Sequence, residues 1–144
     1  MLVHQILKLK DDEGVITLTP GTKVSEAAQL LSSKRIGTIV VSSDGKTAEG
    51  ILSERDIVRE IGKRGSGCLD DTVEALMTRD PVTCSRGEDA QSVLGKMTEG
   101  RFRHLPVVED GEMVGLISIG DVVKARLQEL SMEKEALEGM IMGH

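Results

Sequence analysis

The sequence predicts an α+β fold made of two copies of one strand-helix-strand-strand-helix unit. Segment 16–21, Ile-Thr-Leu-Thr-Pro-Gly, returns at 82–87 as Val-Thr-Cys-Ser-Arg-Gly, and segment 50–58 returns at 115–123 with the shared pattern Gly-h-h-Ser-x-x-Asp, where h is apolar. Short β-branched runs alternate with amphipathic stretches around these landmarks. The offset, 66 residues at the first landmark and 65 at the second, indicates a duplicated unit. We expect two such copies to pack against each other and leave a groove between matching segments.

The size and composition are those of one paired module. The 144 residues, 39% of them hydrophobic, can bury one core, and neither half is expected to be stable alone. We divide the chain into 1–66, an N-terminal segment with the first repeat, and 67–144, the second repeat with a long last helix. The net charge of -6 and a single aromatic residue, Phe102, disfavour binding to nucleic acid or anionic membranes. The sequence lacks a basic leader and an apolar run of about 20 residues, so we expect a soluble cytoplasmic protein.

Each element of the first copy follows from a local pattern. A β-branched run ends at Pro20-Gly21, and apolar residues then recur at helical spacing until Lys34-Arg35. A buried strand, the turn signal Ser43-Asp44-Gly45 and another strand predict a hairpin. The predicted order is strand 15–18, helix 24–35, strand 36–41, strand 49–52 and a helix from Ser53.

The second copy repeats this order. We predict a strand at 81–84, a helix at 90–97, a hairpin of 105–108 with 113–117 around Asp110-Gly111, and a last helix from Asp121. The Gly-rich stretch 62–71 is predicted as the connector, and 73–77 as a short helix that docks on the first copy. Leu2, Ile6 and Leu9 stand at helical spacing, which predicts a short helix that covers the core before the repeats begin.

The last helix is longer than the repeat requires. Apolar residues form a seam along it with a 4-3-7-4 spacing, interrupted by Lys134: Val123, Leu127, Leu130, Leu137 and Ile141. Such a seam needs a partner. It can fold back on the domain, but its length and the pair Met140-Ile141 favour pairing between chains, and hence a homodimer.

Cysteine and histidine placement gives little support to catalysis or to metal binding. Cys84 stands where its repeat counterpart is Leu18, which indicates a small core residue, whereas Cys68 in a Gly-rich stretch stays open as a reactive thiol. The three histidines, His4, His104 and His144, share no ligand spacing with cysteines or acidic residues. Because no nucleophile-base constellation is readable either, we expect no enzyme, no catalytic residue and no metal site.

The repeated Ser-x-x-Asp has two interpretations. Ser53 with Asp56, and Ser118 with Asp121, follow a buried strand and begin a helix, where each pair can form a capping box. At the same place, unpaired backbone N–H groups and the helix dipole favour an anion. A carboxylate at the lip of a groove can also accept hydrogen bonds from vicinal hydroxyls, such as those of a ribose. The doubling of the motif favours a ligand-binding role beside the capping role.

A group of cations precedes and begins the middle strand of the second copy. Segment 101–104, Arg-Phe-Arg-His, brings three potential cations together in an acidic protein, where the first copy has Gly37-Thr38. Strand alternation sends Arg103 and Leu105 to one face and His104 and Pro106 to the other. Either nearby carboxylates pair with these cations or the cations form an anion site, and the contrast between the copies favours the anion site.

The paired Gly-h-h-Ser-x-x-Asp segments, the Arg-His-Leu-Pro-Val run at 103–107 and the Thr17 and Thr83 strands together resemble the cystathionine β-synthase (CBS) domain family, in the form of a stand-alone two-repeat Bateman module. The resemblance covers roughly residues 1–127. It implies that the repeats pack through three-stranded sheets with pseudo-twofold symmetry and leave two clefts. In family members these clefts commonly bind AMP, ADP, ATP, NAD or S-adenosylmethionine, so an adenosine nucleotide is the expected ligand.

The resemblance also assigns site residues. It implies that Asp56 and Asp121 hold ribose hydroxyls, that Ser53 and Ser118 face ribose or phosphate, and that Ile16, Thr17, Val82 and Thr83 contact adenine. It further implies apolar walls from Ile39, Leu105 and Pro106, with Thr38 among the cleft residues, and phosphate neutralisation by Arg103, His104 and Arg55. Gly120 before Asp121 allows close backbone approach, whereas Arg55 precedes Asp56. We therefore expect the Asp121 cleft to be occupied first, with Arg55 within reach of the phosphate.

The implied function is regulatory. A bound nucleotide would shift the conformation or the dimer interface of the module and so tune a partner protein in trans. The alternative is a dimeric interaction or scaffold protein that keeps the fold but has no ligand. The variants Asp56→Ala and Asp121→Ala separate the two, because they abolish nucleotide effects only in the first case.

Overall fold

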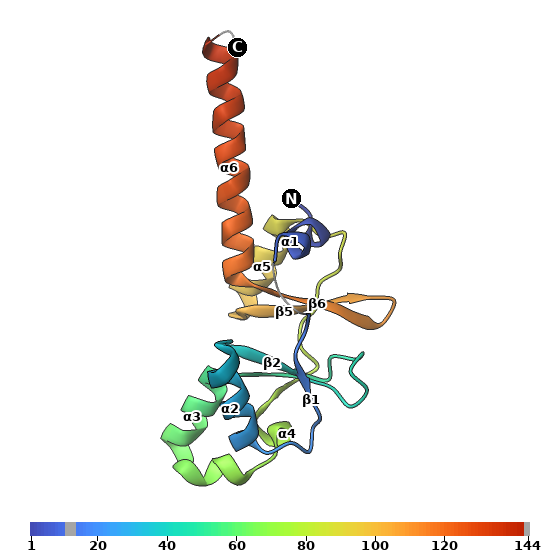
Figure 1. Ribbon diagram of the computed structural model, residues 1–144, viewed down its shortest axis with the longest axis vertical. Coiled ribbons are helices and arrows are strands. Elements are labelled where there is room, and N and C mark those ends of the chain that lie inside the picture. Colours follow the sequence, from blue (N-terminus) through green and yellow to red (C-terminus); the bar gives the residue numbers. More distant parts are fainter. Residues whose placement is uncertain (11–13, 143–144) are drawn as a thin grey trace.

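The computed structural model describes residues 1–10 and 14–142 and has two lobes, one for each repeat (Figure 1). The first lobe holds β1 (Thr17–Leu18), α2 (Val24–Lys34), β2 (Thr38–Val41), β3 (Gly50–Ser53) and α3 (Glu54–Arg64). The second holds α5 (Ala90–Gly100), β5 (His104–Glu109), β6 (Glu112–Ser118) and α6 (Ile119–Met142). The 3₁₀ helix η1 (Ser66–Asp70), α4 (Val73–Leu76) and β4 (Thr78–Arg79) connect the lobes, and α1 (Val3–Leu9) precedes them. The predicted α+β class is confirmed.

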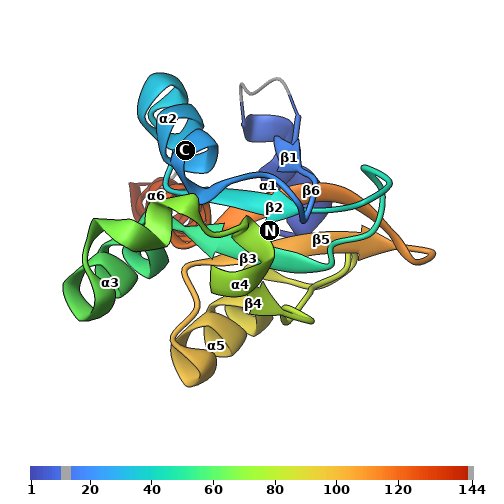
Figure 2. The same ribbon diagram turned by 90° about the horizontal axis from the view of Figure 1, so that it is seen from below.

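The sheets of the two lobes face each other, and helices cover their outer sides (Figures 1 and 2). On β2, Ile39 belongs to the core of the first lobe, whereas Val40 is fully buried but belongs to neither core. On β5, Leu105 belongs to the core of the second lobe, whereas His104 reaches Thr38 of the first. Because successive side chains of a strand point to opposite faces, one face of each sheet packs on the core of its own lobe and the other face is directed toward the other lobe. The predicted separation of Leu105 from His104 is confirmed.

The hairpin of the second repeat closes with a two-residue turn. Asp110 and Gly111 have φ values of 52° and 79°. Two consecutive positive values are what a type I′ turn requires, and an Asp-Gly pair adopts them readily. The turn predicted at this pair is confirmed, and it brings β5 and β6 into antiparallel register.

The strand predicted at 81–84 is wrong. Only Cys84 pairs there, in a parallel bridge to Val107, with its N–H donating to the carbonyl of Pro106 at 3.0 Å. Pro81 has no N–H to donate, which removes one position of a ladder. Thr78–Arg79 pairs instead with β3, so the first sheet has the order β1-β2-β3-β4 and the second has β5-β6 alone. The three-stranded sheets that the resemblance implied are corrected in both lobes.

The short helix before each repeat packs on the lobe of the other repeat. α1 precedes the first repeat, yet Val3 and Ile6 are buried in the core of the second lobe. α4 precedes the second repeat, and Val73 is buried in the core of the first lobe. The predicted docking of segment 73–77 on the first copy is confirmed. This exchange joins the lobes through helices as well as through facing sheets.

Both cysteines are core residues. Cys68 lies in η1 and Cys84 bridges to β5, and both side chains are buried. Burial raises the pKa of the Cys84 thiol to about 12, which keeps it protonated at neutral pH. The position of Cys68, inside the core rather than in an open loop, does not favour the reactive-thiol interpretation.

α6 is the longest helix, and its second half extends away from both lobes (Figure 1). It begins at Ile119, two residues before the predicted start. Within the described residues, no helix combines the length and the apolarity that crossing a bilayer requires.

Candidate ligand-binding cleft

A cleft between the lobes contains a cavity of about 380 Å³, a volume in the range of small-molecule sites. Four segments form it: the start of β2, β3 with the first turns of α3, residues 78–82, and residues 100–104. Both repeats therefore contribute to one site. The lining residues are Gly37, Thr38, Ile51, Ser53, Glu54, Arg55, Asp56, Arg59, Thr78, Pro81, Val82, Gly100, Arg101, Phe102, Arg103 and His104.

Asp56 is held in this cleft by the capping box that its sequence motif predicts. Ser53 N–H donates to Asp56 Oδ2 at 2.9 Å, and Asp56 N–H donates to Ser53 Oγ at 3.2 Å. Arg59, one helical turn further along α3, pairs with the other carboxylate oxygen, Oδ1. The capping interpretation is thus confirmed, and it leaves the carboxylate fixed at the edge of the cavity with spare acceptor capacity on Oδ1.

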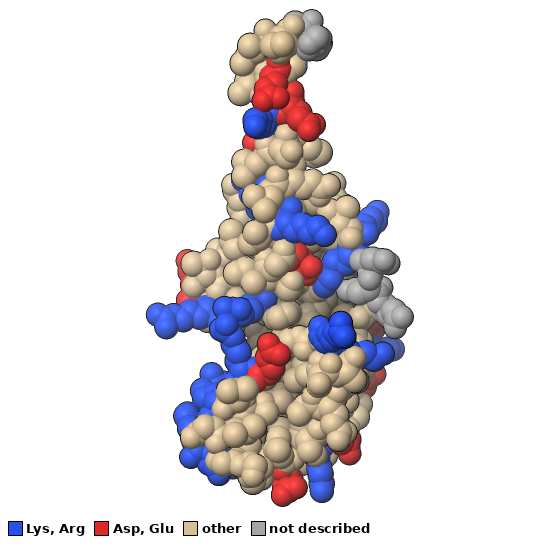
Figure 3. Space-filling model, turned by 60° about the vertical axis from the view of Figure 1, so that its left-hand side comes forward, with Lys and Arg blue, Asp and Glu red and all other residues tan. Residues whose placement is uncertain are grey.

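The cavity is basic although the protein is acidic. Four arginines line it against two carboxylates: Arg55, Arg59, Arg101 and Arg103 against Glu54 and Asp56. Figure 3 shows basic side chains gathered on both lobes along the flank where the lobes meet. The N-terminus of α3 adds the positive end of a helix dipole. Together these groups favour a phosphate-bearing ligand.

Thr38 and His104 occupy equivalent positions of the two repeats and meet between the lobes. Thr38 Oγ1 and His104 Nδ1 are 3.0 Å apart, so the pseudo-twofold axis passes near this hydrogen bond. Burial lowers the pKa of His104, and the charge of Lys10 lowers it further against the opposing effect of Asp121. His104 lines the cavity at Asp56. The charges of Lys10 and Asp121, at the matching position of the second repeat, also affect its pKa.

At that matching position, a side chain of the protein itself reaches the acidic residue. Ser118 N–H donates to Asp121 Oδ2 at 2.8 Å, so the cap recurs, and Lys10 Nζ lies 3.0 Å from the same oxygen. Lys10 also donates to the carbonyl of Leu116 at 2.7 Å. Burial raises the pKa of Asp121, but the hydrogen bond from Ser118 and the Lys10 ammonium outweigh this effect and hold the pKa below its usual range. The cavity described above lies at Asp56, and the expected first occupation of the Asp121 cleft stays a prediction.

The structure brings some of the expected site residues together and places others elsewhere. The cavity collects Thr38, Ser53, Arg55, Asp56, Val82, Arg103 and His104. Ile39 and Leu105 belong to the cores of their own lobes and are outside this lining, so their assignment as cleft walls stays a prediction. The remaining assignments lie outside this lining and stay predictions: Ile16, Thr17, Thr83, Pro106, Ser118, Gly120 and Asp121.

Several lining residues were missed although the sequence carried a signal for two of them. Strand alternation places Ile51 on the same face as Ser53, opposite the core residue Leu52. Arg59 stands three residues after Asp56, which is one turn along a helix. Thr78 carries no such signal, because its place in the cleft depends on the pairing of β4 with β3.

Comparison with known proteins finds one domain family in both halves of the chain. The family model described as CBS domain matches residues 11–63 and 73–128. The CBS domain-containing protein CBSCBSPB2 of Arabidopsis thaliana is 32% identical over 125 residues, which make up 86% of this chain and 23% of that protein. The chain thus spans less than a quarter of this relative's length.

Solved structures share the fold over most of their length. A CBS-domain containing protein from Agrobacterium tumefaciens is 40% identical, with a TM-score of 0.82 over 88% of this chain and 99% of that one. A CBS domain protein from Pyrobaculum aerophilum, solved in complex with AMP, is 28% identical, with a TM-score of 0.77 over 92% and 99%. The CBS domain pair of the protein MJ0100, in complex with 5′-methylthioadenosine and S-adenosyl-L-methionine, is 25% identical, with a TM-score of 0.77 over 90% and 98%.

Proposed function

Because this chain belongs to the CBS domain family, we propose that it is a regulatory module that binds an adenosine nucleotide in the cleft at Asp56. The observation that carries the proposal is the cavity between the repeats, where the Ser53–Asp56 cap of one repeat faces the Arg101–His104 segment of the other. The AMP complex of the Pyrobaculum relative and the 5′-methylthioadenosine and S-adenosyl-L-methionine complex of MJ0100 support an adenosine-type ligand.

In this proposal Asp56 receives the ribose. The two ribose hydroxyls donate to its carboxylate, which the Ser53 cap holds in place. Arg59 then releases Oδ1, a small movement for a side chain that is 58% exposed. Val82, which also lines the cavity, offers backbone groups to the adenine.

The arginines favour a ligand that carries phosphate. Arg55 comes from the first repeat, and Arg101 and Arg103 come from the second, so a phosphate held between them would draw the lobes together. S-adenosylmethionine has no phosphate and carries a positive sulfonium, which the same arginines disfavour. We therefore propose AMP, ADP, ATP or NAD over S-adenosylmethionine for this chain.

The proposed role is binding and signalling rather than catalysis. Asp56 lines the cavity while Asp121 is paired with Lys10, so the two repeated carboxylates do not converge as an acid-base pair. Nucleotide occupancy would act on a partner protein in trans or on contacts within a homodimer. A cytoplasmic location stays a prediction.

Calorimetric titration with AMP, ATP, NAD and S-adenosylmethionine tests the proposal. We expect a Kd in the micromolar range or tighter for at least one phosphate-bearing ligand, about -8 kcal/mol or more favourable. Asp56→Asn should abolish this binding while it retains an oxygen for the Ser53 cap. The matched control Asp121→Asn should bind nearly as the parent chain does.

Two outcomes would contradict the proposal. Heat from none of the four compounds would favour the alternative, a dimeric interaction protein without a ligand. Binding that is lost in Asp121→Asn and kept in Asp56→Asn would move the site to the other cleft. Circular dichroism of both variants verifies that a loss of binding is not a loss of fold.

A further inference from the structure

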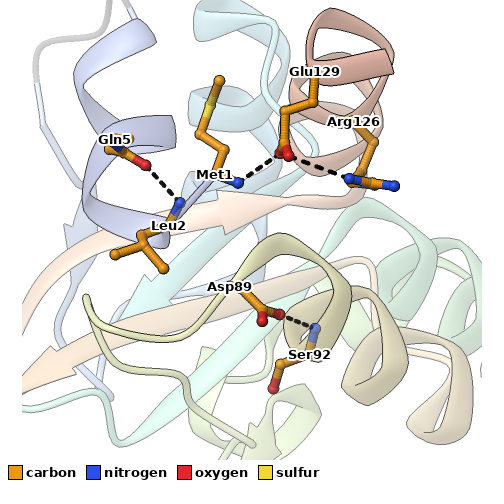
Figure 4. A network of polar contacts seen from close by, with 7 residues as sticks. All are labelled: Met1, Leu2, Gln5, Asp89, Ser92, Arg126 and Glu129. Carbon is orange, nitrogen blue, oxygen red and sulfur yellow. Dashed lines mark hydrogen bonds and ion pairs between the residues drawn. The ribbon is translucent and has the colours of Figure 1, made fainter. Parts of the chain in front are cut away.

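α6 presents two different faces along its length. The first contacts the second lobe: Val122 and Ala125 are buried, and Glu129 accepts from the Met1 ammonium at 2.7 Å and from Arg126 at 3.2 Å (Figure 4). Met132 is the last residue on this face that borders α1. At 100° per residue, the centre of this face lies ~140° around the helix from the apolar seam. The seam is therefore not the surface that anchors α6 to the body.

The seam is open to solvent along its whole length. Its five apolar residues are between 43% and 77% exposed: Val123, Leu127, Leu130, Leu137 and Ile141. They span ~27 Å of helix, and the last two lie beyond the point where the lobe ends. A helix segment of about ten residues that projects into water is marginally stable by itself. A partner along the seam accounts for both the exposure and the projection.

The charges on α6 decide how a second copy can lie on this seam. In a parallel pair in register, each seam residue meets its own counterpart, so Lys134 would face the second copy's Lys134. Glu133 and Glu138 then occupy facing flanks of the two helices, which places like charges together. A parallel pair thus combines a buried lysine pair with repelling carboxylates.

An antiparallel pair centred on Met132 removes these conflicts. Val123 then meets the second copy's Ile141, Leu127 meets its Leu137, and Lys134 meets its Leu130. Lys124 flanks the second copy's Glu138, an opposite-charge contact that occurs twice. Within its own chain, Glu138 Oε1 also lies 3.9 Å from Lys134 Nζ. The two Glu133 carboxylates approach near the centre, and a Lys134 ammonium stands on either side of them.

We propose that two copies of this chain associate through α6 in antiparallel orientation, with the cores of their lobes at opposite ends of the helix pair. This inference rests on the homodimer part of the proposed function and supplies its orientation. It can be tested separately from nucleotide binding, because none of the five seam residues lines the cavity at Asp56.

Disulfide trapping tests the orientation. One preparation carries Val123→Cys and another carries Ile141→Cys; each is oxidised alone, and then the two are mixed and oxidised. We expect a covalent dimer only in the mixture. The native Cys68 and Cys84 are buried and do not compete. As a matched control, Glu135→Cys, exposed on the same helix but off the seam, should not cross-link to Val123→Cys.

Sedimentation equilibrium of the parent chain and of Leu127→Glu completes the test. We expect a concentration-dependent dimer for the parent and a monomer for Leu127→Glu, whose exposed position leaves the fold intact. Cross-links within each single preparation, and none specific to the mixture, would establish a parallel pair and overturn the proposal. A parent chain that stays monomeric over a 100-fold range of protein concentration would also overturn the proposal and would point to a different partner protein. AMP titration of Leu127→Glu distinguishes either failure from a failure of nucleotide binding.

Discussion

Arg35 and Arg101 adopt the same left-handed backbone conformation at equivalent places in the two repeats. Their φ values are 54° and 58°, and each residue ends the first helix of its repeat. Glycine or asparagine is usual at this position, because other side chains crowd the following carbonyl. Arg101 lines the cavity, so at this position the backbone strain accompanies a cation that the proposed site uses.

We expect Arg101→Gly to stabilise the fold and to weaken nucleotide binding. The left-handed conformation costs a non-glycine residue about 1–2 kcal/mol, and the greater freedom of glycine in the unfolded chain offsets part of the gain, which leaves about 0.5–1 kcal/mol. Arg35→Gly should give the same gain in urea unfolding without a change in binding. Equal binding by the parent and Arg101→Gly would remove Arg101 from the site.

His104 should make stability depend on pH. Its pKa in the folded protein lies below the ~6.5 of an unfolded chain. As the pH falls below ~6.5, His104 takes up a proton in the unfolded chain before it does so in the folded protein. The contribution of neutral His104 to folding stability is therefore complete above ~6.5 and is lost as the pH falls through the folded pKa. We expect a lower urea midpoint at pH 5 than at pH 7.5, and a smaller difference for His104→Gln. An unchanged difference in the variant would assign the effect to other groups.

At the level of elements, the second strand of each hairpin, β3 or β6, has a glycine against which a side chain from a short helix packs. Met77, directly after α4, packs on Gly50, and Leu7 of α1 packs on Gly115. A Cβ at Gly50 of β3 would overlap Met77 Sδ and approach its Cγ to 2.8 Å. A Cβ at Gly115 of β6 would approach the Cδ1 methyl of Leu7 to 2.9 Å. These contacts seat α4 on the first lobe and α1 on the second.

The two glycines should differ in their tolerance of alanine. Gly50→Ala displaces both Met77 atoms and is expected to destabilise the fold by about 1–3 kcal/mol. Gly115→Ala meets only the end of the Leu7 side chain, which can rotate, and we expect less than about 1 kcal/mol. Thermal unfolding followed by circular dichroism measures both, since the chain has neither Trp nor Tyr. The reverse order would show that α1, rather than α4, is the rigidly seated helix.

Local sequence patterns predicted most helices and strands, but they did not predict which elements pair or pack with one another. The repeat spacing and the Asp110-Gly111 pair predicted the hairpins, because both act through the nearby backbone. Segment 81–84 failed as a strand because Pro81 removes a backbone donor, which is a local effect, and because Thr78–Arg79 takes the edge of β3, which is a tertiary pairing. The site followed the same division: the Ser53–Asp56 cap is local, whereas the approach of Lys10 to Asp121 joins residues more than 100 positions apart.

For the whole molecule, the exchanged helices make the two lobes interdependent. Ile6→Ala removes a buried side chain of α1 from the core of the second lobe, and we expect it to destabilise that lobe by about 2–5 kcal/mol. The amides of α5 should then exchange faster with deuterated solvent. Val73→Ala, the counterpart in α4, should accelerate exchange in α2 instead. On Ile6→Ala, faster exchange in the first lobe without faster exchange in α5 would contradict the exchanged arrangement.

The exchange of α1 and α4 also bears on how a duplicated chain of this kind arises. In a single-repeat ancestor, the leading helix would pack on another copy rather than on its own sheet, as α1 and α4 do here. Such an ancestor would fold as a swapped homodimer, each subunit lending its first helix to its twin. Fusion of two genes would then have joined subunits that were already interlocked, and α4 would be the leading helix of what was once a separate polypeptide.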